Sequence, residues 1–265
     1  LVVDLPAGDY TVTLVAGDPT GPTDISITAE TIAKVQPTTK PAGETLEMSF
    51  DLALVDGQLN LELGGTAANL AALTITRLPD RVAAGTPTAF LTGDSTVQTY
   101  TSDYAPQAGW GQMLPRFLAD DVTVANHAIG GRSSKNFISQ GRLDEVLRQI
   151  EPGDYLFVQF GHNDNSFGVD DRYAAPADYA DYLRTFVDGA VQRGATPVVV
   201  TPVSRRAVDA QGAFTVSFPE YVQAATDLAA AEGVPLVDLS RLSREYLDSI
   251  GAEAAKSVFL HVPAG

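Results

Sequence analysis

From Thr88 onward, short apolar runs alternate with longer amphipathic stretches, and this alternation restricts the possible folds more than any other feature of the chain. The apolar runs have the length of buried strands and lie at residues 89–91, 122–129, 155–160, 198–200 and 236–239. The amphipathic stretches have helical periodicity and lie at residues 111–118, 143–150, 177–193, 219–232 and 240–250. Strands that alternate with helices pair in parallel, because each helix carries the chain back across a face of the sheet. We therefore predict an α/β fold, a doubly wound parallel sheet with helices on both faces.

Residues 1–80 have a different pattern, which is typical of an all-β domain. Polar and apolar residues alternate at 10–15, 24–27, 46–50 and 59–63, and clusters of glycine and proline separate these segments. Segments 5–10 and 71–78 resemble the opening and closing strands of a small jelly-roll of the galactose-binding-like type. A polar connection follows at 79–87, so we predict a β-sandwich accessory domain at 1–80 and a second domain at 88–265.

The first residues, Leu1, Val2 and Val3, have the character of the middle of a strand. We therefore expect the β-sandwich domain to be incomplete at its N-terminus and a signal peptide to precede it in a secreted precursor. Domains of this type sometimes bind sugars. The alternative is that the domain serves as a packing partner for residues 88–265, and the absence of an aromatic platform in its strands favours this second interpretation.

The charge and composition exclude several kinds of partner and site. A formal net charge of −16 disfavours nucleic acid and anionic lipid, because both would be repelled. No apolar run approaches the roughly 20 residues of a membrane helix, so no membrane insertion is expected. The absence of cysteine excludes disulfides and thiolate metal sites. No cluster of histidines and acids has ligand spacing, so we expect no metal and no organic cofactor.

A candidate nucleophile follows the first apolar run of the α/β region. Residues 89–91 lead into Gly93, Asp94 and Ser95, as when a buried parallel strand delivers a side chain to the edge of a sheet. A serine hydroxyl needs a base to take its proton and fixed donors to hold the oxyanion that its attack creates. The alternative is that Asp94 and Ser95 only cap a helix that begins there.

Two later strand ends carry residues that suit an oxyanion hole. Gly130 and Gly131 follow the second apolar run, where paired glycines let a backbone N–H approach a ligand. Asn163 follows the third run, and its uncharged amide suits a site where negative charge appears only in the transition state. Each feature alone is also typical of an ordinary turn. Their occurrence in order on successive strand ends is much more specific.

Together these motifs resemble the SGNH or GDSL hydrolase superfamily, and most closely its rhamnogalacturonan acetylesterase-like members, carbohydrate esterase family 12. The segments that carry the resemblance are 93–97, 109–111, 128–133 and 159–164. The resemblance implies a flavodoxin-like fold with Ser95 as the nucleophile. It also implies an oxyanion hole made of the backbone amides of Ser95 and Gly131 and the side chain of Asn163.

One part of the family pattern is missing. Members of the family carry Asp-x-x-His in a last block, where the histidine is the base and the aspartate orients it. The residues three positions before the three histidines, His127, His162 and His261, are Val124, Gln159 and Val258. Residues 258–265 resemble the segment that precedes the block, so we expect the chain to lack the triad Asp and His. As a substitute base His162 is disfavoured, because alternation along a strand turns it away from Asn163.

Four further residues near these motifs allow two interpretations each. Trp110 either packs in the core or stacks on a sugar, and the core is favoured. Arg132 either binds a substrate carboxylate or forms a salt bridge. Arg205 and Arg206 follow the fourth apolar run and either add positive charge near the site or lie in a solvated loop.

The function predicted from these features is a secreted carbohydrate esterase that removes O-acetyl groups from pectin, rhamnogalacturonan or xylan through a serine acyl-enzyme. Its partner would be an acetylated polysaccharide or oligosaccharide. One alternative is a lipase or phospholipase of the same superfamily, and another is a non-catalytic glycan-binding protein on a hydrolase scaffold. Short acyl groups are favoured by the polar residues of the candidate loops, which are Gln98, Ser102, Asp103, Ser133, Ser134, Lys135, Asn165 and Ser166. The choice of polysaccharide and the oligomeric state stay open at this point.

Overall fold

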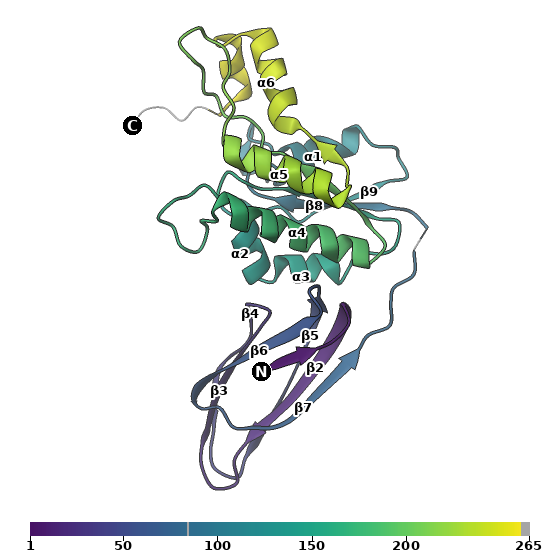
Figure 1. The fold of residues 1–265 in the computed structure, drawn as a ribbon, viewed down its shortest axis with the longest axis vertical. Coiled ribbons are helices and arrows are strands. Elements are labelled where there is room, and N and C mark those ends of the chain that lie inside the picture. Colours follow the sequence, from purple (N-terminus) through teal and green to yellow (C-terminus); the bar gives the residue numbers. More distant parts are fainter. Residues whose placement is uncertain (84, 261–265) are drawn as a thin grey trace. The chain divides into compact units, whose positions relative to one another are not determined.

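The computed structural model of the protein describes residues 1–83 and 85–260 (Figure 1). It divides into two compact units. The first contains residues 1–83 together with 137–152 and 188–195, and the second contains the remaining described residues. The first unit therefore includes short helical segments that follow the β-rich region by more than fifty residues.

The strands of the first unit form two antiparallel sheets around one apolar core. They are β1 (Val2–Asp4), β2 (Gly8–Gly17), β3 (Thr23–Ala29), β4 (Ile32–Lys40), β5 (Thr45–Leu54), β6 (Gln58–Ala67) and β7 (Leu70–Arg77). The sheet orders are β1-β6-β3-β4 and β5-β2-β7. Alternate residues of β2 and β3, such as Val12, Leu14, Ile25 and Ile27, are fully buried in the core that both sheets share. The predicted all-β region is thus present.

Strand β4 was not predicted from the sequence. It contains Pro37 and several polar residues, which weaken the alternating pattern expected of a strand. In the structure β4 lies at the end of its sheet, where it pairs with β3. An edge strand tolerates proline because one of its two sides needs no backbone donor.

Five parallel strands form the sheet of the second unit, as predicted. They are β8 (Thr88–Gly93), β9 (Thr123–Asn126), β10 (Tyr155–Gln159), β11 (Thr196–Val200) and β12 (Leu236–Val237). Their order is β12-β11-β10-β8-β9, so the third strand in the sequence pairs with the first. The strand order therefore reverses between β8 and β10, and ligands of such sheets bind outside the carboxyl ends at that point.

The helices follow the sequence pattern with two exceptions. They are α1 (Trp110–Met113), α2 (Ser134–Ser139), α3 (Arg142–Leu147), α4 (Pro176–Gln192), α5 (Pro219–Glu232) and α6 (Leu239–Ile250), with 3₁₀ turns η1 (Ser102–Tyr104), η2 (Leu114–Arg116) and η3 (Ala254–Val258). The helix expected at 111–118 is only α1 followed by η2. Pro115 has no N–H to continue the α-helical ladder, so the helix tightens into a 3₁₀ turn. Helix α2 was not predicted.

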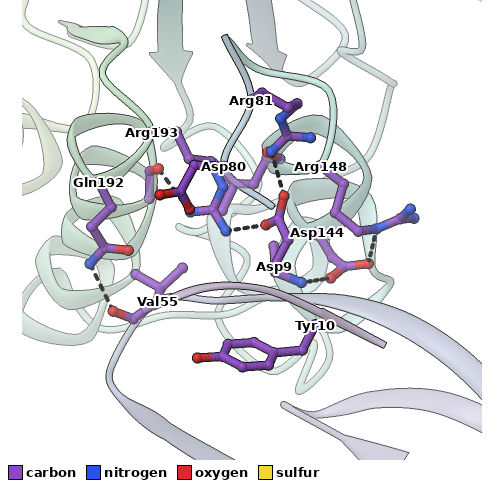
Figure 2. A network of polar contacts seen from close by, with 12 residues as sticks. Asp9, Tyr10, Val55, Asp80, Arg81, Asp144, Arg148, Gln192 and Arg193 are labelled. Atoms are coloured by element: carbon purple, nitrogen blue, oxygen red, sulfur yellow. Dashed lines mark hydrogen bonds and ion pairs between the residues drawn. The ribbon is translucent and has the colours of Figure 1, made fainter. Parts of the chain in front are cut away.

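An ion-pair network inside the first unit links its strands to its helical segments. Figure 2 shows the carboxylate of Asp9 on β2 between the guanidinium groups of Arg81 and Arg193, at 2.5 and 2.6 Å. A second carboxylate, Asp144 on α3, is 3.2 Å from Nε of Arg148. The network explains why the short segments at 137–152 and 188–195 belong with the strands.

Candidate active site

Ser95 lies in a tight turn at the carboxyl end of β8. The Asp94 carboxylate holds this turn, because its Oδ1 accepts hydrogen bonds from the backbone N–H and the hydroxyl of Thr96, both at 2.8 Å. Asp94 is fully buried, whereas Ser95 is partly exposed. No helix begins in the turn, so the alternative that Asp94 and Ser95 cap a helix is wrong.

The end of β8 requires glycine at position 93. A Cβ atom on Gly93 would lie 2.5 Å from Cγ2 of Val97 and 2.8 Å from the backbone oxygen of Gln159. Only a residue without a side chain allows the turn and the end of β10 to approach β8 so closely. Gly93 therefore brings the turn that carries Ser95 against the strand that leads to Asn163.

The loop after β9 passes directly beside the nucleophile. The backbone N–H of Gly130 donates to Oε1 of Gln98, and a Cβ atom on Gly130 would lie 3.5 Å from Cβ of Ser95. The next residue, Gly131, has a φ of 77°, which glycine adopts without strain. Gln98 thus acts as a clamp between the Ser95 turn and this loop, a role that the sequence alone did not suggest.

The loop after β10 contacts the same glycine loop. Nδ2 of Asn163 donates to the backbone oxygen of Arg132 at 2.9 Å, which places the Asn163 amide beside Gly131. Nη1 of Arg132 donates in turn to the backbone oxygen of Gly130 at 2.9 Å. The structure therefore brings Ser95, Gly131 and Asn163 together through contacts between three successive strand ends.

The buried residue Asp164 holds together the loops that follow β9 and β10. Its Oδ1 accepts hydrogen bonds from the backbone N–H of Ser134 at 2.9 Å and from the Ser134 hydroxyl, and its Oδ2 accepts from the N–H of Gly161 at 2.8 Å. The residue is completely buried, and burial raises the pKa of its carboxyl to about 6. Its position directly after Asn163, in the loop that follows β10, was the sequence signal for this role.

The raised pKa of Asp164 makes a specific contribution to the pH dependence of stability. The folded protein holds this proton more tightly than the unfolded chain, so the resulting stability is lost as the pH rises from about 4 to about 6. Asp164→Asn cannot titrate. We expect the free energy of unfolding of the wild type, minus that of the variant, to fall by roughly 2.5 kcal/mol between pH 4 and pH 7. Urea unfolding at one-unit pH steps measures this difference, and a constant value would contradict the assignment.

A cavity of about 530 Å³ adjoins Ser95. Its lining residues include Ser95, Trp110, Met113, His162, Arg205, Tyr246, Leu247 and Phe259, all of which belong to the second unit. Gly131 and Asn163 do not line it. Most of these side chains are apolar, so the cavity differs from the polar surface that the loop sequences indicated.

His162 lines this cavity together with Ser95, contrary to the expectation that it turns away from the site. The alternation of a strand does not extend to it, because β10 ends at Gln159 and Gly161 has a φ of 121°. Its Nε2 lies 2.8 Å from the backbone oxygen of Val203, and its ring is 4.8 Å from that of Phe218. Burial lowers the pKa of the His162 imidazole, which favours the neutral ring.

The other residues singled out from the sequence have defined contacts. Nε1 of Trp110 donates to Oε1 of Gln159 at 2.7 Å, and Trp110 both packs against the core around Leu91 and lines the cavity. The Arg205 guanidinium lies 4.7 Å from the centre of the Phe218 ring. Arg206 is exposed, with Nη2 3.5 Å from the backbone oxygen of Ala252. His261 lies outside the described residues.

Comparisons with known proteins agree with this geometry. The profile of the GDSL-like Lipase/Acylhydrolase family matches residues 91–261. The chain is 45% identical over 172 residues to the probable rhamnogalacturonan acetylesterase YesY of Bacillus subtilis, covering 64% of this chain and 78% of YesY. It is 39% identical over 171 residues to the rhamnogalacturonan acetylesterase RhgT of the same organism, covering 64% and 72%.

A solved structure resembles the chain over nearly its whole length. The crystal structure of YxiM from Bacillus subtilis has a TM-score of 0.62 and 32% sequence identity, covering 98% of this chain and 72% of that one. The resemblance inferred from the motifs at 93–97, 128–133 and 159–164 is therefore confirmed. Among the described residues, no helix is both long and apolar enough to span a membrane. The chain belongs to the GDSL-like lipase/acylhydrolase family, and it is an esterase of the serine type.

Proposed function

We propose that the protein removes O-acetyl groups from a plant or microbial polysaccharide, with rhamnogalacturonan as the first substrate to test. The observation that supports this most directly is the meeting of three strand ends at Ser95, where Gly130 packs against the serine and Asn163 is bonded to the neighbouring loop. Relatives at 45% and 39% identity are named as rhamnogalacturonan acetylesterases, one of them as probable. These names favour acetyl esters of pectin over other esters.

In the proposed mechanism Ser95 Oγ attacks the carbonyl carbon of the acetyl ester. The backbone N–H groups of Ser95 and Gly131 and the Asn163 amide hold the oxyanion. The C–O bond to the sugar then breaks, the sugar hydroxyl leaves with a proton, and water hydrolyses the acetyl-enzyme to acetate. In the family pattern the histidine of an Asp-x-x-His segment takes the serine proton, and none of the residues three positions before His127, His162 and His261 is acidic.

The cavity beside Ser95 supports a second candidate function. Trp110, Met113, Leu247 and Phe259 give it an apolar lining that would accept an acyl chain longer than acetyl. The sequence argument against long chains relied partly on Ser133 and Ser134, but both are completely buried and bond within the loops. A lipase-type esterase on the same machinery is therefore the alternative to a carbohydrate acetylesterase.

One set of assays on the full-length protein separates the two functions. Acetate release from acetylated rhamnogalacturonan and acetylated xylan is measured beside hydrolysis of nitrophenyl esters from acetate to decanoate. We expect acetate release from polysaccharide and a preference for acetate in the ester series. A preference for hexanoate or longer chains, with no acetate released from either polysaccharide, would establish the lipase-type alternative.

We also propose that residues 1–80 form a galactose-binding-like jelly-roll domain, that residues 88–265 form the hydrolase domain, and that the protein is secreted. The two antiparallel sheets with a shared core support the first point. A polymeric substrate outside the cell supports the last. Fractionation of the producing culture tests secretion, because activity that stays in the cytoplasm would contradict it.

A further inference from the structure

The segment that follows Asn163 is anchored on the loops of the site. The backbone N–H of Ala174 donates to the oxygen of Asp164 at 3.1 Å, which closes this segment on itself. Nζ of Lys135 on α2 donates to the oxygen of Asp170 at 2.6 Å. The N–H groups of Arg172 and Tyr173 both donate to the oxygen of Val169, at 2.9 and 2.8 Å. Residues 165–173, which we call the site loop, thus have a defined position next to the glycine loop.

The site loop places the side chain of Arg172 against Gly131. A Cβ atom on Gly131 would lie 3.4 Å from Nη2 and 3.8 Å from Cζ of Arg172, so the guanidinium lies next to this glycine. The N–H of Gly131 is one of the proposed oxyanion donors. Arg172 therefore lies next to the glycine whose N–H is one of the proposed oxyanion donors.

Arg172 has no partner within the described part of the protein. It is half-buried, and among residues 1–83 and 85–260 its guanidinium forms no ion pair and no hydrogen bond. The neighbouring cations do have partners, since Arg132 and Lys135 donate hydrogen bonds to the backbone oxygens of Gly130 and Asp170. The chain has 33 acidic residues against 17 basic ones, so acidic partners are plentiful in the sequence. A half-buried cation that is nevertheless unpaired is suited to an anionic ligand.

An exposed aromatic residue of the site loop adds a second recognition element. Phe167 is 85% exposed, and its ring lies 5.3 Å from that of Tyr173 in an edge-to-face arrangement. A fixed and solvent-facing aromatic ring offers a surface on which the apolar face of a sugar can stack. The site loop thus carries a cation next to Gly131 and, five residues earlier, an exposed aromatic ring.

We propose that Arg172 binds the carboxylate of a uronic acid residue in the polysaccharide, close to the acetyl group that is removed. This proposal rests on the proposed function and selects its substrate class, an acidic polysaccharide over neutral xylan. It also explains how a protein with a net charge of −16 accepts an anionic polymer, because a local cation at the site offsets the repulsion. Arg172 is a specificity-determining residue in this scheme and takes no part in the chemical step.

The test compares full-length wild type with Arg172→Gln, using Arg116→Gln as the control because Arg116 is an exposed arginine outside the site loop. The substrates are an acetylated oligogalacturonide, the same compound with its carboxylates methyl-esterified, and nitrophenyl acetate. We expect Arg172→Gln to raise KM for the acidic substrate at least tenfold with kcat unchanged. KM for the two neutral substrates should change less than twofold, and 0.5 M NaCl should remove the difference between the wild type and the variant.

A binding measurement separates failure of this proposal from failure of the proposed function. Trigalacturonate without acetyl groups is titrated into each protein by calorimetry, and binding to the wild type should be at least tenfold tighter than to Arg172→Gln. Equal binding by the two proteins would overturn the assignment of Arg172 even if the wild type releases acetate. Tighter binding by the wild type without acetate release would support Arg172 and overturn the proposed function instead.

Discussion

Replacement of Ser95 by alanine is expected to lower kcat for acetyl ester hydrolysis by the full-length protein by at least about 10⁴-fold. Without the Ser95 hydroxyl no acyl-enzyme forms, and only the oxyanion donors and substrate binding remain to accelerate attack by water. The turn itself should persist, because Asp94 holds it through Thr96 and not through the serine side chain. The hydrogen bond of 2.9 Å from the Tyr100 hydroxyl to the backbone oxygen of Ser95 should also be kept in Ser95→Ala, because it does not involve the serine side chain.

Ser102→Ala is the matched control, because Ser102 is an exposed serine at the start of η1 that follows the same strand. Its kcat should stay within twofold of the wild type. Both variants are compared with the wild type by initial rates on nitrophenyl acetate, and by thermal unfolding to verify that they fold. If Ser95→Ala retained activity within tenfold of the wild type in a folded protein, the nucleophile would have to be another residue.

The elements that the sequence predicted well are those whose pattern depends on local physics. Helix α5 begins at Pro219 and ends at Glu232, as expected from proline at a helix start and from Gly233 just past its end. The parallel strands followed from short apolar runs between helices. The order of the strands in the sheet could not be predicted in this way, because the pairing of β10 with β8 depends on how segments far apart in the sequence pack. The failures at β4 and α1 each involve a proline, whose effect depends on whether its missing donor is needed.

The site shows the same division between local and tertiary information. Ser95, Gly131 and Asn163 could be singled out because each follows a predicted strand in a recognisable motif. Arg172 lies outside every motif, and only the folded site loop brings its guanidinium to Gly131. The direction of His162 also depended on a backbone turn at Gly161 that strand alternation does not describe. Motifs thus identified the groups proposed for catalysis, whereas the residue proposed for specificity required the structure.

Asp144→Ala is expected to lower the free energy of unfolding by about 3 to 5 kcal/mol, because it removes a buried carboxylate that is paired with cations. The Asp144 side chain is only 6% exposed and has three partners. Its Oδ1 accepts from the backbone N–H of Ala53 at 2.6 Å, and its Oδ2 lies 3.1 Å from Nζ of Lys34 and 3.2 Å from Nε of Arg148. Alanine would leave a buried N–H without an acceptor and remove the carboxylate that neutralises a Lys34 side chain only 11% exposed.

Glu145→Ala is the control, because Glu145 is the next residue of α3 and is exposed, so its loss should change stability by less than about 0.5 kcal/mol. Asp144→Asn should be intermediate, because the amide oxygen still accepts from Ala53 but carries no charge for Lys34 and Arg148. Urea unfolding of the three variants and the wild type gives the free energies. If Asp144→Ala were no less stable than Glu145→Ala, the contacts of Asp144 would contribute nothing that water does not replace. In the expected outcome, the Asp144 carboxylate on α3 is one of the main links between the strands and the helical segments of the first unit. The sequence pattern of an amphipathic helix does not predict this role.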